Sequence, residues 1–231
     1  MNESAFSYFS RDLSWIEFNA RVLDEARQKN VPLLERLRFL TIVSSNFDEF
    51  FMVRVASLKE QSLRDPEVRD EAGLRAREQL SLISARVHEL IDIQYECLLG
   101  EILPGLAAEG ILYIPPAHLS QEHIAFLDAF FMSDVFPLLT PLRTGAGALP
   151  SIANLRLHAA FLLRSNIAIP SGPLASFLER TGVINGVSGD DSPEPASPLA
   201  IVQIPASIPR VVWLPSSDGK QRFTLLDDVV R

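Results

Sequence analysis

Prolines divide this sequence into two regions of different character. Of its 16 prolines, all but Pro32, Pro66 and Pro104 follow residue 106. Because proline removes a backbone donor and fixes φ, regular helices are favoured before that point, and turns with short strands after it. We therefore predict an α+β chain: a helical bundle over residues 1–106, then a mixed α+β domain over residues 107–231 that is incomplete at its C-terminus.

Residues 13–18 carry the signals of a helix start. Ser14 can cap the amide of Glu17 and Glu17 can return the bond, while Leu13 and Phe18 have the spacing of a hydrophobic staple. Apolar residues then recur every three or four positions. The inward face of this helix is expected to consist of Trp15, Phe18, Val22 and Ala26.

Two further helical segments follow in the first region. Pro32 suits the first turn of a second helix, which is apolar on more than one side and is therefore expected to be central. After Asp65 and Pro66, a stripe of apolar residues predicts a long helix over about residues 67–103. Three or four such helices packed as a bundle are the simplest architecture.

The second region alternates short apolar runs with turn residues. "GILYIPP" predicts a strand and residues 120–132 a helix, while "NLRLHAAFLL", "LAIVQIP", "RVVWLP" and "RFTLL" predict an antiparallel or mixed sheet. Residues 171–197 are rich in Gly, Ser, Pro and Asp and predict a surface loop. Asp227 is placed to cap a helix of which only four residues remain, so we expect the natural chain to continue past Arg231.

Composition excludes several classes of protein. The net charge of -8 and the pI near 5.0 argue against nucleic acid as the main partner, because nucleic acid attracts basic surfaces. The single cysteine, Cys97, excludes an internal disulfide and a cysteine-based metal site. No apolar run approaches the length of a transmembrane segment, and no signal peptide is recognisable. A cytoplasmic protein is therefore expected.

Catalytic signals are sparse. The sequence has no Gly-rich phosphate loop, no metal-binding spacing of His and Cys, and no nucleophile elbow. Its four histidines, His88, His118, His123 and His158, lie in different predicted elements. Structural roles are the simpler interpretation of each, so we assign no catalytic residue and no metal ligand.

A polar cluster, "SSNFDEFF" at residues 44–51, interrupts the apolar pattern. Asn46 with Glu49 forms a capping pair, and Ser45 with Asp48 is a frame-shifted alternative, so a break between two helices is the favoured interpretation. The other is a ligand site that involves Asn46.

Arg36, Arg38 and Arg54 flank this cluster. They could form salt bridges to Glu35, Asp48 or Glu49. They could equally form a basic wall that faces a phosphate-bearing ligand, because guanidinium groups bind phosphate oxygens bidentately.

Motifs spread over about fifty residues around the cluster carry a family resemblance. They are Leu13-Ser14-Trp15, Phe18-Asn19, Arg21-Val22-Leu23, Pro32-Leu33, Glu35-Arg36, Arg38-Phe39-Leu40, Ser45-Asn46, Asp48-Glu49-Phe50 and Val53-Arg54. Together they resemble the opening of bacterial polyphosphate kinases of the large, histidine-phosphorylating type. "VQIPASIPRVVWLP" and "FTLLDDVVR" extend the resemblance, whereas residues 171–197 depart from the family pattern.

The resemblance implies a four-part enzyme that transfers the terminal phosphate of ATP reversibly to polyphosphate through a phosphohistidine, with Mg2+. This chain would hold the helical first domain and part of the head domain used for dimerisation. The phosphohistidine and the Mg2+ ligands would lie in domains that it lacks, so the chain alone is expected to be inactive. Within it, Asn46 takes the position that contacts ATP in the family. The alternative is a non-enzymatic helical module that binds a protein partner.

Overall fold

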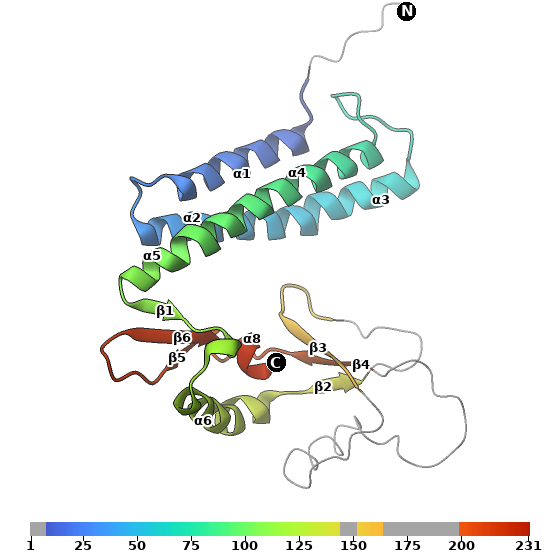
Figure 1. The fold of residues 1–231 in the computed structure, drawn as a ribbon. Helices are drawn as coiled ribbons and strands as arrows, with labels where there is room; N and C mark the ends of the chain where they lie inside the picture. Colours follow the sequence, from blue (N-terminus) through green and yellow to red (C-terminus); the bar gives the residue numbers. More distant parts are fainter. Residues whose placement is uncertain (1–7, 144–151, 164–198) are drawn as a thin grey trace, which may run out of the picture. The chain divides into compact units, whose positions relative to one another are not determined.

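The computed structural model describes residues 8–143, 152–163 and 199–231. The chain divides into two compact units, Met1–Gly110 and Ile111–Arg231 (Figure 1). The predicted loop at residues 171–197 lies outside the described residues. Among those that are described, no helix combines the length and the apolar character needed to cross a lipid bilayer.

The first unit is a bundle of helices, as predicted (Figure 1). Helix α1 packs against α2 and α4, and α3 packs against α4. Two five-residue π-helices, η1 and η2, join α2 to α3 and α4 to α5 without a loop. The elements are α1 (Arg11–Arg27), α2 (Leu33–Phe50), η1 (Phe51–Val55), α3 (Ala56–Arg64), α4 (Ala76–Cys97), η2 (Leu98–Ile102) and α5 (Leu103–Ala108).

The predicted start of α1 was wrong. The helix begins at Arg11, and Ser14 lies inside its first turn, where its Oγ donates to the carbonyl of Ser10 at 2.8 Å. The inward face also differs, since Phe18 is 50% exposed. The buried residues of α1 are Asp12, Ile16, Asn19, Leu23 and Ala26. Two polar residues share this face because each finds a partner on the facing helical segments, Asn19 with Asn46 of α2 and Asp12 with Arg54 of η1.

The π-helices coincide with breaks in the buried seam of each long helix. From α2 through α3 the buried residues are Arg36, Leu40, Val43, Phe47, Phe50, Val55, Leu58 and Ser62. Their spacing is three or four except for the five-residue step from Phe50 to Val55, which spans η1. Cys97 and Ile102 show the same step across η2. A π-turn absorbs one extra residue, so both helices keep one buried face along their length.

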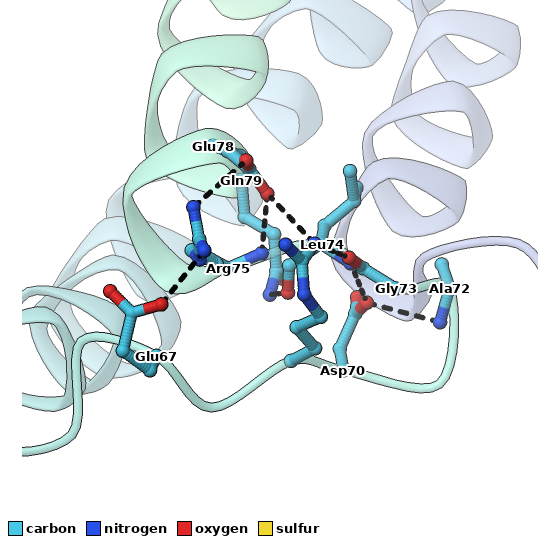
Figure 2. Close-up of polar contacts among 9 residues, drawn as sticks. Glu67, Asp70, Ala72, Gly73, Leu74, Arg75, Glu78 and Gln79 are labelled. Atoms are coloured by element: carbon cyan, nitrogen blue, oxygen red, sulfur yellow. Dashed lines mark hydrogen bonds and ion pairs between the residues drawn. The ribbon is translucent and has the colours of Figure 1, made fainter.

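The predicted long helix begins later than expected, at Ala76 rather than near residue 67. Figure 2 shows the reason: the carboxylate of Asp70 accepts hydrogen bonds from the backbone N–H groups of Ala72 at 3.0 Å and Leu74 at 2.8 Å. Gly73 in the same turn has a φ of 82°. The side chain of Glu78 then accepts from the N–H of Arg75 at 2.7 Å, which satisfies a free donor at the start of α4. Local side-chain bonds thus hold this segment out of the helix.

Over its described residues, the second unit contains two three-stranded sheets. In the first sheet, of order β1-β6-β5, β6 pairs parallel with β1 and antiparallel with β5. In the second, β4 lies between β2 and β3 and pairs antiparallel with both. The strands are β1 (Ile111–Tyr113), β2 (Pro141–Arg143), β3 (His158–Leu162), β4 (Leu199–Gln203), β5 (Val211–Leu214) and β6 (Gln221–Leu225). The α+β class and the short strands were predicted correctly.

One core joins the helices and both sheets of this unit. It contains Leu127, Val135, Leu139, Val202, Ile204, Val212, Leu214, Leu226 and Val230. Helix α6 (Gln121–Phe130) supplies Leu127 and continues into a π-helix, η4 (Phe131–Val135). The short helices are η3 (Pro116–His118), η5 (Phe136–Leu138) and α8 (Leu226–Val230). Leu225 holds the N-cap position of α8, so the predicted cap at Asp227 was wrong.

Candidate functional site

The polar cluster at residues 44–51 does not break a helix. Helix α2 runs without interruption from Leu33 to Phe50, so Asn46 lies in its interior and caps nothing. The buried residues Val43, Phe47 and Phe50 keep helical spacing straight through the cluster. Burial of this seam outweighs the capping preference of Ser45 and Asn46, and the cap interpretation was wrong.

Asn46 makes its hydrogen bond across to α1. Its Nδ2 donates to Oδ1 of Asn19 at 2.7 Å. Asn19 has no exposed surface, and its own Nδ2 donates to the carbonyl of Trp15 at 3.1 Å. Asn46 itself is partly exposed. A buried amide and a partly exposed one therefore share a short, defined hydrogen bond.

Arg54 is held by a second residue of α1. Its Nε and Nη2 donate to the two carboxylate oxygens of Asp12 at 2.9 and 3.0 Å. The side chain of Asp12 is 6% exposed and that of Arg54 is 42% exposed. The hydrogen bond to Asp12 raises the pKa of Arg54 above its usual value, because it outweighs the opposing effect of burial. Arg54 thus keeps its charge, and part of its side chain is exposed to solvent.

Aromatic rings lie between these two polar pairs. Trp15 stacks on Phe50 with ring centroids 4.4 Å apart and an interplanar angle of 6°, and it meets the ring of Phe47 edge-on at 6.2 Å. Along the antiparallel helices the order is Asp12 with Arg54, Trp15 with Phe50, and Asn19 with Asn46. We call these six residues the α1–α2 ladder. It fixes two partly exposed polar groups, Asn46 and Arg54, on a rigid support.

The other two predicted arginines lie elsewhere. Arg36 is buried: its Nε donates to the carbonyl of Ala26 at 2.6 Å, and its Nη2 bonds Glu101. This bond to Glu101 raises the pKa of Arg36 above its usual value and lowers that of Glu101. Arg38 is exposed and lies 3.8 Å from Glu35. Only Arg54 of the three belongs to the α1–α2 ladder with Asn46.

Three of the histidines make hydrogen bonds with residues that are close to them in the sequence. Nδ1 of His88 lies 2.6 Å from the carbonyl of Ser84, and Nδ1 of His158 lies 2.9 Å from that of Arg156. His123 pairs with Ser120 at the start of α6. Over residues 8–143, 152–163 and 199–231, no group of three His, Cys, Asp or Glu side chains is placed to hold a metal ion.

Sequence reasoning missed Asp12 and Asn19, although the sequence holds a signal for them. Both share the spacing of Ile16, Leu23 and Ala26, so they are polar residues on an otherwise apolar face. A polar residue in such a position needs a buried partner. A search for polar residues in register with the apolar seam would have selected this pair.

Comparisons with known proteins agree over both units. Residues 8–114 match the polyphosphate kinase N-terminal domain and residues 122–231 match the polyphosphate kinase middle domain. The chain is 38% identical to a polyphosphate kinase from Bacillus anthracis over an alignment of 234 positions, which covers 100% of this chain and 30% of that protein. It is 42% identical to polyphosphate kinase 1 from Chlorobaculum tepidum over 188 residues, 79% of this chain and 27% of that one.

A solved structure shows the same fold. The crystal structure of polyphosphate kinase from Porphyromonas gingivalis superposes with a TM-score of 0.72 at 28% identity. The match covers 97% of this chain and 30% of that chain. The chain therefore spans about 30% of the length of such relatives.

Proposed function

Because this chain belongs to the polyphosphate kinase family, we propose that it is the N-terminal portion of an enzyme that transfers the terminal phosphate of ATP reversibly to polyphosphate. Its part is to contact ATP and to supply surface for a homodimer or a higher homo-oligomer. Phosphoryl transfer itself is assigned to residues outside this chain. The observation that carries the ATP contact is the α1–α2 ladder, in which buried partners hold Asn46 and Arg54 toward solvent on one face.

Arg54 suits the phosphate end of a nucleotide. The bidentate pair with Asp12 uses Nε and Nη2, and no described residue accepts a hydrogen bond from Nη1 of Arg54. A guanidinium that is already held in place loses little conformational freedom when it binds a phosphate oxygen. The partly exposed Arg54 is therefore better prepared for this role than Arg36, whose nitrogens bond Ala26 and Glu101.

Magnesium enters this proposal with ATP and not as an ion held by this chain. The carboxylate nearest to Asn46 and Arg54 in the α1–α2 ladder is that of Asp12, and both of its oxygens accept from Arg54. Mg2+ needs oxygen ligands that are available to it. The described residues of the α1–α2 ladder therefore do not fit a Mg2+ site.

Nuclear magnetic resonance of the 231-residue chain tests the ATP contact. We expect ATP to shift the side-chain amide signals of Asn46 and the Nε–H signal of Arg54 in a saturable way. Arg54→Met should weaken binding of both ATP and inorganic tripolyphosphate. Arg38→Met is the matched control, because Arg38 is an exposed arginine of α2, which continues into η1, and lies outside the α1–α2 ladder; it should leave both titrations unchanged.

Two results would contradict the proposal. One is an ATP titration in which the signals of Asn46 and Arg54 stay in place. The other is an equal loss of binding in Arg54→Met and Arg38→Met, which would indicate only a general attraction of phosphate to positive charge.

The non-enzymatic interaction module is not favoured, because the polyphosphate kinase match extends over both units. Oligomerisation and a cytoplasmic location, where ATP is available, are part of the proposal. One feature consistent with self-association is the edge strand β5, on which Val211 and Trp213 are 39% and 53% exposed. Light scattering coupled to gel filtration would measure the oligomeric state directly.

A further inference from the structure

The hydrogen bonds around Asn19 fix the orientation of its amide group. The carbonyl of Trp15 can only accept a hydrogen bond, so Asn19 must direct Nδ2 toward it. The carbonyl oxygen of the Asn19 amide is then the atom that faces Asn46 at 2.7 Å. This assignment follows from donor and acceptor chemistry and needs no observed hydrogen.

The same logic fixes the amide of Asn46. An oxygen that faces Asn46 requires a donor, so Asn46 must direct its Nδ2 toward Asn19. Rotating the Asn46 amide by half a turn would place two oxygens in contact and would leave the acceptor of Asn19, which has no exposed surface, without a donor. Asn46 is therefore held in one of its two amide orientations.

From this chain of bonds we infer that Asn19 is a positioning residue, which makes the carbonyl oxygen of Asn46 the atom offered to the nucleotide. No described residue donates to this Oδ1. The inference rests on the proposed ATP contact and specifies it. An acceptor oxygen is repelled by phosphate oxygens and attracts hydrogen-bond donors. On ATP those donors belong to the nucleoside: the 6-amino group of adenine and the hydroxyl groups of ribose.

The distance between Asn46 and Arg54 along the α1–α2 ladder agrees with a nucleotide whose nucleoside lies at Asn46. Asn46 and Arg54 are eight residues apart along one continuous helical segment, which corresponds to about 12 Å of helix rise. An extended nucleoside triphosphate has a comparable length. Its nucleoside would lie at Asn46 and its phosphates at Arg54, so each end meets the group of complementary chemistry.

The test compares nucleotide analogues on the 231-residue chain and on Asn19→Leu. The analogues are purine riboside triphosphate, which lacks the 6-amino group, 2′-deoxy-ATP and 3′-deoxy-ATP, each of which lacks one hydroxyl, and inorganic tripolyphosphate, which lacks the nucleoside. In the unchanged chain, we expect one of the nucleotide analogues to bind about tenfold more weakly than ATP. Which analogue loses affinity identifies the donor that Asn46 contacts.

In Asn19→Leu the amide of Asn46 can rotate, so this preference for ATP over the weak analogue should fall to about twofold or less. The affinity for tripolyphosphate should stay the same, a result that a merely structural role of Asn19 would not give. Asn19→Ala is a second variant in case the larger side chain does not fit. Gln79→Leu is the matched control, since it removes another buried helical amide of this unit without touching Asn46.

Three results overturn the inference while the ATP contact stands. They are equal binding of ATP and the three nucleotide analogues, an unchanged preference in both Asn19 variants, and a loss of tripolyphosphate affinity in Asn46→Leu. The failure of the proposed function looks different: ATP would then leave the Asn46 signals of the unchanged chain in place.

Discussion

Asp12 and Arg54 lie on different helical segments and meet through two parallel hydrogen bonds, Nε to Oδ1 at 2.9 Å and Nη2 to Oδ2 at 3.0 Å. The pair is asymmetric in burial, since the side chain of Asp12 is 6% exposed and that of Arg54 is 42% exposed. Its two members should therefore respond differently to substitution.

Arg54→Met should lower the free energy of unfolding by about 1–3 kcal/mol, because it leaves the carboxylate of Asp12 buried without a donor. Asp12→Leu should cost less, because Arg54 can turn to water. The double variant Asp12→Leu/Arg54→Met should recover part of the loss seen in Arg54→Met. Urea unfolding of the unchanged chain, the two single variants and the double variant measures the four free energies of unfolding of a double-mutant cycle. Strictly additive effects would mean that the pair contributes no coupling.

Arg36 and Arg38 should differ sharply in their contribution to stability. Arg36→Met removes a buried guanidinium and leaves the carbonyl of Ala26 with only the weak thiol donor of Cys97 at 3.5 Å, so we expect a loss of about 2–3 kcal/mol. Arg38→Met removes only an exposed pair and should change stability by less than about 0.5 kcal/mol. Thermal unfolding distinguishes the two. Equal melting temperatures would contradict the structural role assigned to Arg36.

Tyr113 should make the second unit sensitive to alkaline pH. Its hydroxyl donates to Asp228 at 2.8 Å, and burial together with this bond raises the pKa of Tyr113 to about 12 from the ordinary value of 10.0. The folded chain therefore retains a proton that the unfolded chain releases. The contribution of the Tyr113 hydroxyl to the stability of the folded chain is fully present below about pH 10 and is lost as the pH rises toward 12.

In Tyr113→Phe, the free energy of unfolding should fall less steeply between about pH 10 and pH 12, because phenylalanine has no proton to release. The measurement is urea unfolding at several alkaline pH values, compared between the two chains. The difference between the chains isolates Tyr113 from the other groups that titrate in the same range. Parallel pH profiles would show that the hydroxyl titrates as it does in water.

Deletion of one residue from the π-helix η1 should be tolerated. Removing Val53, which is 57% exposed, shortens the five-residue step between Phe50 and Val55 to four, the ordinary spacing of a helical face. We expect the unfolding free energy to stay within about 2 kcal/mol of the unchanged chain.

Deletion of Thr41 is the control for that experiment. It shortens the step from Leu40 to Val43 to two residues. On one side of the deletion, the buried residues of the helix are then rotated away from the core. Loss of cooperative unfolding is expected for this variant alone. Similar damage from both deletions would show that η1 does not accommodate an extra residue.

Regular spacing and turn residues predicted much of the fold. The helical first unit and the strands around "LAIVQIP", "RVVWLP" and "RFTLL" follow from apolar periodicity bounded by prolines and glycines. The errors arose where local signals competed with packing. Ser14 and Asn46 are good capping residues, but burial of the seams on either side of them continued both helices. Asp70 had the opposite effect, because its backbone bonds kept residues before Ala76 out of a helix.

The candidate site was predictable only in part. Asn46 came from a family resemblance, and Arg54 was one of three arginines that sequence alone could not rank. Asp12 and Asn19, which hold these residues, lie 42 and 27 positions away in the chain. Their partners depend on which faces of α1 and α2 meet, and that is decided by the whole bundle.

The extra residue in η1 also affects how relatives should be aligned with this chain. A relative without the π-turn needs a single gap between Phe50 and Val55, and no other position of the gap keeps both buried seams matched. A gap placed upstream of Asn46 would compare that asparagine with its neighbour, about 100° away around the helix. Correct placement of one gap therefore determines which residue of each relative is recognised as the counterpart of Asn46.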